Sequence, residues 1–170
     1  MRKFVRPKIG RTLIVGSRVY RGREDRRQAY PDAIGVDMLA GRGVDHVLDL
    51  EESGAALTLG QFAHIECWSV LEHSRRPWLL AANLEAMLET GGTIHVTVPF
   101  AWRVHNFPSD YWRFSKEGVR ALFPSIDWRH VMFAQDKLRD NNRTPTLNKD
   151  AESGPSWIAR TEVLAFGVRT

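Results

Sequence analysis

The chain is nearly free of cysteine. Its single thiol, Cys67, excludes a disulfide within the chain and a zinc site built from several cysteines. Cys67 lies in an apolar run, so we expect it to be a residue of the core. The sequence therefore predicts a protein that does not depend on an oxidising compartment.

Long apolar runs and clustered metal ligands are also missing. No segment approaches the roughly 20 apolar residues of a membrane helix, and residues 1–11 are basic without the apolar stretch of a secretory signal. The chain has six histidines, but no two of them lie at metal-ligand spacing with a third nearby. We therefore expect a cytoplasmic protein with no membrane span and no metal site.

The length and composition fit one globular domain over residues 1–170, since 43% of the residues are hydrophobic and 26% are charged. Charge is unevenly distributed: residues 1–27 hold ten Lys and Arg against two acids, whereas the whole chain carries +4. The basic segment, residues 1–11 above all, could attract nucleic acid or another anionic partner, or could be a solvated face. No zinc-finger spacing or RRM-type aromatic signature accompanies it.

Short apolar runs predict the first strands of a sheet. We expect strands at Thr12–Gly16, Ala33–Asp37, Val44–Asp49 and Phe62–Trp68. The second and third of these runs end in an acid, and the first ends in glycine. Runs of this kind are typical of buried parallel strands that lead into loops.

The second half of the chain contains clearer periodicity. Residues 77–89 form an amphipathic pattern that predicts a helix, with Gly91-Gly92 as its stop, and residues 93–98 alternate as a strand does. Ser115 is expected to cap a helix that runs to Phe123. Strands are then predicted at Ile126–Ala134 and Trp157–Val168.

Alternating strands and helices followed by a strand pair indicate a Rossmann-like, doubly wound, mostly parallel sheet with a C-terminal antiparallel hairpin. The two last strands are separated by a polar loop at residues 135–156. The first strand begins only about 11 residues into the chain, so part of one sheet face is expected to be uncovered or to be met by a second subunit in a homo-oligomer.

In such sheets, ligands bind in the crevice beyond the carboxyl ends of the strands. Gly16 and Ser17 follow the first predicted strand, Asp37 ends the second, and Asp49 ends the third. The sequence therefore places small and acidic residues together at this crevice.

Four segments resemble motifs of class I S-adenosylmethionine-dependent methyltransferases, of the small type 11-like kind. Ile34–Asp37 is similar to the acidic motif of that family, Cys67–His73 to the fourth-strand motif with its Leu-Glu-His triplet, and Thr90–Pro99 to the glycine turn and fifth strand. Asp110–Phe114, with His105 and Pro108 before it, resembles a segment of small methyltransferases of glycan and cell-surface biosynthesis. Together these motifs extend over residues 12–123.

The resemblance implies a site for S-adenosylmethionine and a methyl acceptor. Asp37 would accept hydrogen bonds from the ribose hydroxyls with Met38 beside the adenine, while Asp49 and Leu50 would address the adenine edge. The remaining expected donor contacts are Gly16, Ser17, Arg18, Trp68 and Leu71. On the acceptor side we expect His105 and Asp110 as catalytic groups and, as binding residues, His73, Trp102, Tyr111, Trp112 and Arg113.

The acceptor is expected to be a small molecule or a glycan, with a hydroxyl slightly favoured. A hydroxyl needs a neighbour to take its proton, which is the role expected of His105 or Asp110. The alternative for Asp110 is an ion pair with Arg113 that orders the loop. The aromatic residues could stack on a sugar or simply plug the end of the sheet.

The first loop departs from the family pattern. Two glycines of the usual Gly-x-Gly-x-Gly are replaced by Arg18 and Tyr20. Arg18 could pair with the carboxylate of the donor, or the loop could have lost the donor. The second interpretation gives a noncatalytic scaffold or a nucleic-acid-associated binding protein of the same fold. A nicotinamide-dependent oxidoreductase is a weaker alternative, because the Gly-x-Gly-x-x-Gly fingerprint is missing.

Overall fold

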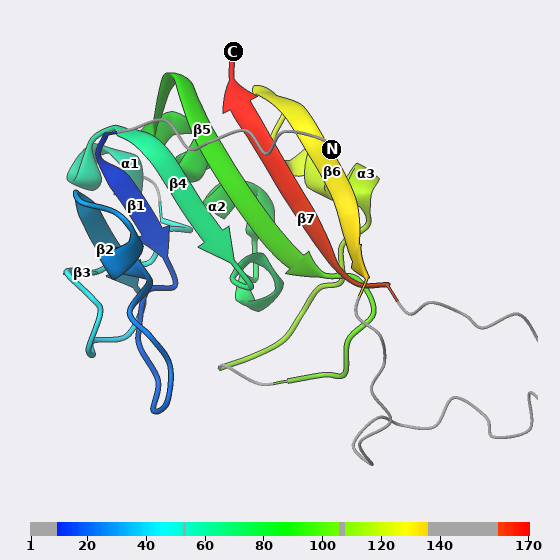
Figure 1. The fold of residues 1–170 in the computed structure, drawn as a ribbon, viewed down its shortest axis with the longest axis horizontal. Helices are drawn as coiled ribbons and strands as arrows, with labels where there is room; N and C mark the ends of the chain where they lie inside the picture. The colour runs from blue at the N-terminus through cyan, green and yellow to red at the C-terminus, as the bar shows by residue number, and fades with distance from the viewer. Residues whose placement is uncertain (1–9, 53, 106–107, 136–159) are drawn as a thin grey trace, which may run out of the picture.

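The computed structural model describes residues 10–52, 54–105, 108–135 and 160–170. Within them, one sheet has the strand order β3-β2-β1-β4-β5-β7-β6 (Figure 1). Its strands are β1 (Thr12–Val15), β2 (Ala33–Asp37), β3 (His46–Val47), β4 (Phe62–Trp68), β5 (Leu88–Pro99), β6 (Ile126–Gln135) and β7 (Arg160–Arg169). Most of residues 1–11 and of the polar loop 135–156 lie outside the described residues.

The first five strands are parallel to one another, and β7 runs antiparallel between β5 and β6. This topology confirms the predicted Rossmann-like, mostly parallel sheet with an antiparallel hairpin at its end. It is the strand plan of the class I methyltransferase fold.

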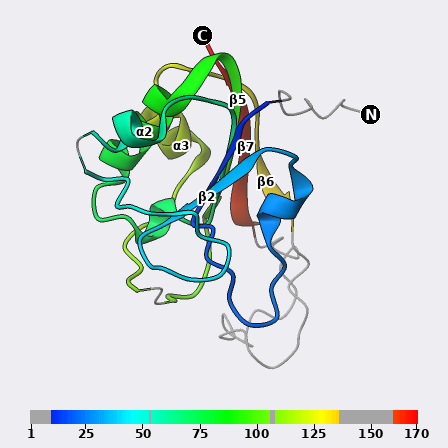
Figure 2. The same ribbon diagram turned by 90° about the vertical axis from the view of Figure 1, so that its left-hand side faces the viewer.

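The helices cover one face of the sheet. Helices α1 (Ala55–Leu59), α2 (Pro77–Met87) and α3 (Lys116–Leu122) all lie behind the strands in the view of Figure 1. The short helix η1 (Arg26–Ala29) lies on the opposite side (Figure 2). Among the described residues, no helix is long and apolar enough to cross a membrane.

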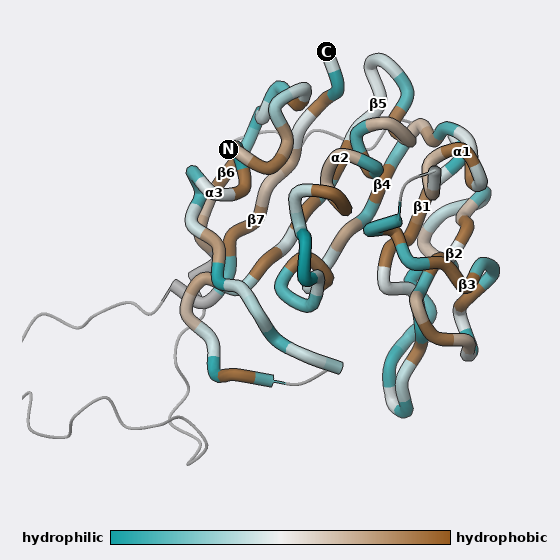
Figure 3. Tube along the Cα trace, turned by 180° about the vertical axis from the view of Figure 1, so that it is seen from behind, coloured by the Kyte–Doolittle hydropathy of each residue, from teal (hydrophilic) through white to brown (hydrophobic). Residues whose placement is uncertain are grey.

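The core lies between the sheet and these helices. Inward-facing strand residues such as Leu13, Ile65 and Val96 are fully buried and pack in one cluster with Leu84 of α2. Viewed from the helical side, hydrophobic residues follow the strands and α2 (Figure 3). Cys67 is fully buried in this cluster, as predicted.

The junction of α2 and β5 differs from the prediction. The helix ends at Met87, and β5 begins at once with Leu88, which pairs with Phe62 of β4. Gly91 has a φ of +72°, and the pairing register shifts in this region. The glycines thus form an irregularity within the strand instead of the stop of the helix, because sheet pairing overrides local helix propensity.

Two other elements also differ from the prediction. Strand β3 keeps only His46–Val47 of the predicted Val44–Asp49, at the exposed edge of the sheet. Helix α1 was not predicted, because five residues are too few to show helical periodicity. By contrast, β2 and β4 have their predicted bounds, and the Ser115 hydroxyl caps α3 by accepting from the Gly118 amide.

Gly35 provides a test of how tightly β2 packs. A Cβ at this position would lie 2.2 Å from the carbonyl oxygen of Gly43 and 2.6 Å from Oγ of Ser17. Since the first contact is with backbone, Gly35→Ala is expected to lower the free energy of unfolding by about 1–3 kcal/mol. A Cβ at Gly118, in α3, would meet no atom closer than 3.6 Å. Gly118→Ala should therefore raise the free energy of unfolding by about 0.5–1 kcal/mol. Urea unfolding of both variants checks this, and equal midpoints would contradict it.

Candidate functional site

A cleft of about 1080 Å³ lies at the carboxyl ends of the first strands. Eight of the nine predicted donor residues line it: Gly16, Ser17, Arg18, Asp37, Met38, Asp49, Leu50 and Trp68. The ninth, Leu71, is fully buried in the core and does not line the cleft. The fold therefore brings together residues from four loops that are far apart in the sequence.

Gly16 lets the first loop turn close to the loop after β4. Its φ is +64°, and an added Cβ would lie 2.6 Å from Cγ2 of Val70. The Gly16 carbonyl accepts a hydrogen bond from the Arg26 guanidinium at 3.1 Å. Only glycine fits here without movement of Val70.

Asp37 ties two loops together at the edge of the cleft. Its carboxylate accepts hydrogen bonds from the backbone amides of Arg18 (3.2 Å) and Leu39 (3.0 Å). A carboxylate has about four lone-pair sites. Each oxygen can therefore accept a further hydrogen bond from a ligand in the cleft.

The first loop also presents an unused hydroxyl. Ser17 lines the cleft, and its Oγ is buried with no hydrogen-bond partner among the residues that the structure describes. A buried polar group of this kind is usually satisfied by a ligand or by water. The oxygen is turned toward Gly35 of β2, so Asp37 is the polar group of these two that a bound molecule can reach.

The bulky residues of the first loop lie in the wall of the cleft. The Arg18 guanidinium carbon lies 5.4 Å from the centre of the Tyr20 ring, and that of Arg26 lies 5.2 Å from the ring of Trp68. Arg23 also lines the cleft. Guanidinium groups therefore gather here, which suits an anionic group of a ligand. Sequence analysis missed Arg23 and Arg26, although they lie in the basic region before β2.

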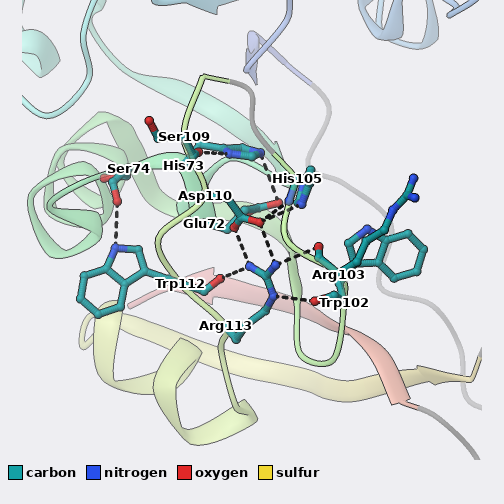
Figure 4. A network of polar contacts seen from close by, with 10 residues as sticks. All are labelled: Glu72, His73, Ser74, Trp102, Arg103, His105, Ser109, Asp110, Trp112 and Arg113. Carbon is teal, nitrogen blue, oxygen red and sulfur yellow. Dashed lines mark hydrogen bonds and ion pairs between the residues drawn. The ribbon is translucent and has the colours of Figure 1, made fainter. Parts of the chain in front are cut away.

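The opposite side of the cleft is lined by His73, Ser74, His105 and Pro108. These residues belong to, or lie beside, two segments that the sequence had indicated separately. Helix η2 (Leu71–His73) follows β4, and the segment 108–114 follows β5. The Tyr111 amide donates to the Glu72 carbonyl at 2.8 Å, and Trp112 Nε1 donates to the Ser74 carbonyl at 2.9 Å. The Asp-Tyr-Trp-Arg segment is thus docked on the Leu-Glu-His segment (Figure 4).

These contacts divide the predicted acceptor residues into two groups. His73 and His105 line the cleft. The other predicted residues do not line it: Trp102, Asp110, Tyr111, Trp112 and Arg113. Tyr111 and Trp112 are exposed, and both donate hydrogen bonds to carbonyls of the segment after β4. Their positions favour a structural role over stacking on an acceptor.

The Asp110 carboxylate is fully enclosed. The Arg113 guanidinium donates to both of its oxygens, at 2.5 and 2.8 Å, and the His105 amide donates to Oδ2 at 2.7 Å. The hydrogen bonds from Arg113, assisted by His105, lower the pKa of Asp110 despite its burial. Oδ2 also lies 3.1 Å from Nδ1 of His105. This geometry makes Asp110 a residue that positions His105 and Arg113, the loop-ordering alternative.

His73 is held in one tautomer. Its Nδ1 lies 2.6 Å from the Ser109 carbonyl, which can only accept, so Nδ1 carries the proton and Nε2 has a lone pair. Burial lowers the pKa of His73 and raises that of the adjacent Glu72 to about 7. The rings of His73 and His105 lie 4.9 Å apart, although 32 positions separate them in the sequence. The spacing of histidines along the chain did not indicate this convergence.

A second polar cluster lies outside the cleft, on the face of the sheet that α1, α2 and α3 do not cover. Here β4 presents His64 and Glu66. Nε2 of His64 donates to the Glu66 carboxylate at 2.9 Å, and the Tyr30 hydroxyl donates to the same oxygen. Nδ1 of His95 lies 3.1 Å from the other oxygen. Burial would raise the pKa of Glu66, but these three partners outweigh it and hold the pKa at about 2. Sequence analysis missed this cluster; the signal was polar residues at every second position of an otherwise apolar strand.

Comparison with known proteins is informative at the level of structure. No protein-family model matches the sequence, and no curated protein matches it. A SAM-dependent methyltransferase from Archaeoglobus fulgidus has 12% identity and a TM-score of 0.65, with 95% of this chain and 86% of that chain covered. The N-methyltransferase NodS from Bradyrhizobium japonicum WM9, in complex with S-adenosyl-L-homocysteine, has 11% identity and a TM-score of 0.62, with 95% and 78% covered.

A third similar structure also contains an acceptor molecule. It is the 1,6-didemethyltoxoflavin-N1-methyltransferase from Burkholderia thailandensis, with bound 1,6-didemethyltoxoflavin and S-adenosylhomocysteine. Its identity is 12%, its TM-score is 0.62, and the alignment covers 96% of this chain and 72% of that one. These similarities show that the chain has the class I methyltransferase fold.

Proposed function

We propose that this chain is an S-adenosylmethionine-dependent methyltransferase that acts on a small molecule or glycan, with a hydroxyl as the methyl acceptor. The observation that carries the proposal is the cleft, in which Gly16, Asp37 and Asp49 meet at the carboxyl ends of the strands. This is where sheets of this kind bind nucleosides.

The residues present fit the donor. The two oxygens of Asp37 retain acceptor capacity for ribose hydroxyls. Met38 is 55% exposed and lines the cleft close to the buried Leu50, which suits a flat apolar base. Arg18 supplies a cation for the carboxylate of the donor.

The acceptor is assigned to the side of the cleft that His73 and His105 form. When bound, the donor would supply a methyl group on its sulfonium sulfur; in-line attack of the acceptor on that methyl carbon would break the carbon–sulfur bond. The chain contributes by fixing the positions of both partners, because alignment accounts for much of the catalysis of such a displacement. A hydroxyl placed at this side of the cleft meets imidazole nitrogens, which can assist loss of its proton.

The substrate class rests on two observations. The Burkholderia thailandensis relative holds a small molecule together with S-adenosylhomocysteine. The Asp110–Phe114 segment resembles that of methyltransferases of glycan biosynthesis, which favours a hydroxyl acceptor.

A noncatalytic protein of the same fold is the second candidate. The observation that favours it is the presence of Arg18 and Tyr20 in the cleft wall, where the family has glycines. The two candidates differ in donor binding. Titration with S-adenosylmethionine, S-adenosylhomocysteine and NAD by calorimetry separates them and also tests the nicotinamide alternative.

Asp37→Ala is expected to weaken S-adenosylhomocysteine binding by about 1–3 kcal/mol, because charge-assisted hydrogen bonds to the ribose are lost. Asp37→Asn keeps one acceptor oxygen for the loop amides and should show a smaller loss. Calorimetric titration of the folded variants measures both.

Asp32→Ala is the matched control. Asp32 is exposed at the amino end of the same strand, away from the cleft. Its substitution should leave the affinity unchanged. If Asp37→Ala binds S-adenosylhomocysteine as the unmodified protein does, the proposed donor site is wrong.

A further inference from the structure

The histidines at the acceptor side of the cleft belong to a tighter cluster. Glu72 and His73 lie in η2, and His105 lies in the loop after β5. Each residue offers one ligand atom, and the three atoms lie within 4.8 Å of one another. Figure 4 shows the three side chains converging on one point.

The Glu72 carboxylate is the least satisfied group in this cluster. The residue is 1% exposed, and neither carboxylate oxygen has a hydrogen-bond partner among the described residues. Oε1 lies 3.8 Å from Nε2 of His73, too far for a hydrogen bond. A buried carboxylate without partners is costly, and binding of a cation would offset that cost.

In each of the two imidazoles, Nδ1 contacts an oxygen of the surrounding protein, as is typical of histidine ligands of metals. Nδ1 of His73 donates to the Ser109 carbonyl, which leaves the Nε2 lone pair on the side of Glu72. Nδ1 of His105 lies 3.1 Å from the carboxylate of Asp110, which Arg113 fixes in turn. Both rings are therefore oriented before any ion binds.

We propose that Glu72, His73 and His105 bind one divalent transition-metal ion, for which Zn²⁺ is the natural choice. Two imidazole nitrogens and one carboxylate oxygen suit zinc, whereas Mg²⁺ and Ca²⁺ prefer oxygen ligands alone. Ligand atoms about 2.1 Å from a tetrahedral ion lie roughly 3.4 Å apart, so small side-chain movements close the site.

Three protein ligands leave a fourth position. Because His73 and His105 line the cleft, that position is accessible from the acceptor side. The role of the ion rests on the proposed function. In a methyltransferase with a hydroxyl acceptor, the ion would bind the acceptor oxygen and make its proton easier to lose. His73 and His105 would then hold the ion, and the hydroxyl proton would pass to water in the open cleft as the oxygen takes the methyl group from the donor sulfur.

The test is metal binding by the whole chain. Protein freed of metal with a chelator is titrated with ZnCl₂ by calorimetry, and CoCl₂ is added separately to read the visible absorption of a low-coordinate cobalt site. We expect one ion per chain. Glu72→Gln, which is nearly isosteric, should lower the Zn²⁺ affinity by more than about 100-fold and abolish the cobalt spectrum.

His46→Asn is the matched control, because His46 is exposed on β3 and away from the cluster. It should bind Zn²⁺ as the unmodified protein does. Absence of saturable binding in the unmodified protein, or equal affinity in a folded Glu72→Gln variant, overturns the inference.

Titration of the same metal-free protein with S-adenosylhomocysteine keeps the two proposals apart. Donor binding without zinc binding removes only the metal site. Zinc binding without donor binding supports the metal site and removes the methyltransferase proposal.

Discussion

Glu66→Ala is expected to lower the free energy of unfolding by about 2–6 kcal/mol, because two hydrogen-bonding groups lose their acceptor at about 1–3 kcal/mol each. The substitution leaves the His64 imidazole, which is fully buried, and the Tyr30 hydroxyl without their shared acceptor. Typical domains have a total stability of about 5–15 kcal/mol. A large fraction of the stability therefore depends on this one carboxylate, and urea unfolding at neutral pH measures it.

The pKa of the Glu66 carboxylate also allows a prediction of how the stability depends on pH. The pKa of Glu66 is about 2 in the folded protein, below its usual 4.5. A lowered pKa stabilises the fold fully above pH 4.5, and this contribution is lost as the pH falls toward 2. The difference between these two pKa values corresponds to about 3 kcal/mol of folding stability. Glu66→Gln should therefore lose less stability than the unmodified protein between pH 5 and pH 2.

Glu117→Gln is the control for this comparison. The Glu117 side chain is 76% exposed and forms a surface pair with Arg120. Its substitution should leave both the stability and its pH dependence unchanged. If the unfolding midpoints of Glu66→Gln and of the unmodified protein fall in parallel with pH, the Glu66 carboxylate does not have the assigned role.

His105→Ala is expected to lower kcat by about 10²- to 10⁴-fold with nearly unchanged affinity for S-adenosylhomocysteine. His105 lines the acceptor side of the cleft, and Asp110 holds its ring. The donor contacts lie in other loops, so their binding should persist. Label transfer from S-adenosylmethionine to a hydroxyl acceptor, together with calorimetry, measures both quantities. His46→Ala serves as the control.

The neighbouring aromatic residues should behave differently. Tyr111 and Trp112 anchor the loop on the segment after β4 and do not line the cleft. Their replacement by alanine should lower the melting temperature, whereas a binding platform would instead raise the KM for the acceptor. For His105→Ala, a loss of thermal stability with unchanged specific activity would count against the assigned role.

Much of the sheet could be predicted because its strands are short, apolar and bounded by glycines or acids. Ala33–Asp37 and Phe62–Trp68 are predicted with their observed bounds for this reason. The meeting of Gly16, Asp37 and Asp49 also follows from the sequence, since the carboxyl ends of parallel strands share one edge.

Side-chain direction and long-range pairing could not be predicted in the same way. His73 and His105 meet because β4 and β5 are adjacent and parallel, but nothing in the spacing shows that both rings turn inward. From the sequence, Asp110 could be a catalytic group or could form an ion pair with Arg113 that orders the loop. Its enclosure by Arg113 in the structure favours the second role. The Glu66 cluster joins Tyr30, His64 and His95 from three elements, so its members are visible only once the strands are in register.

The position of β7 has a consequence for how the chain folds during synthesis. This strand follows β6 in the chain, yet it lies between β5 and β6 and supplies Val163 and Ala165 to the core. Strands β1 to β5 can pair as they leave the ribosome, whereas β6 has no neighbour in the sheet until β7 has emerged. The nascent protein therefore passes through a stage with two open strand edges, at β5 and β6, that are prone to pair with another chain.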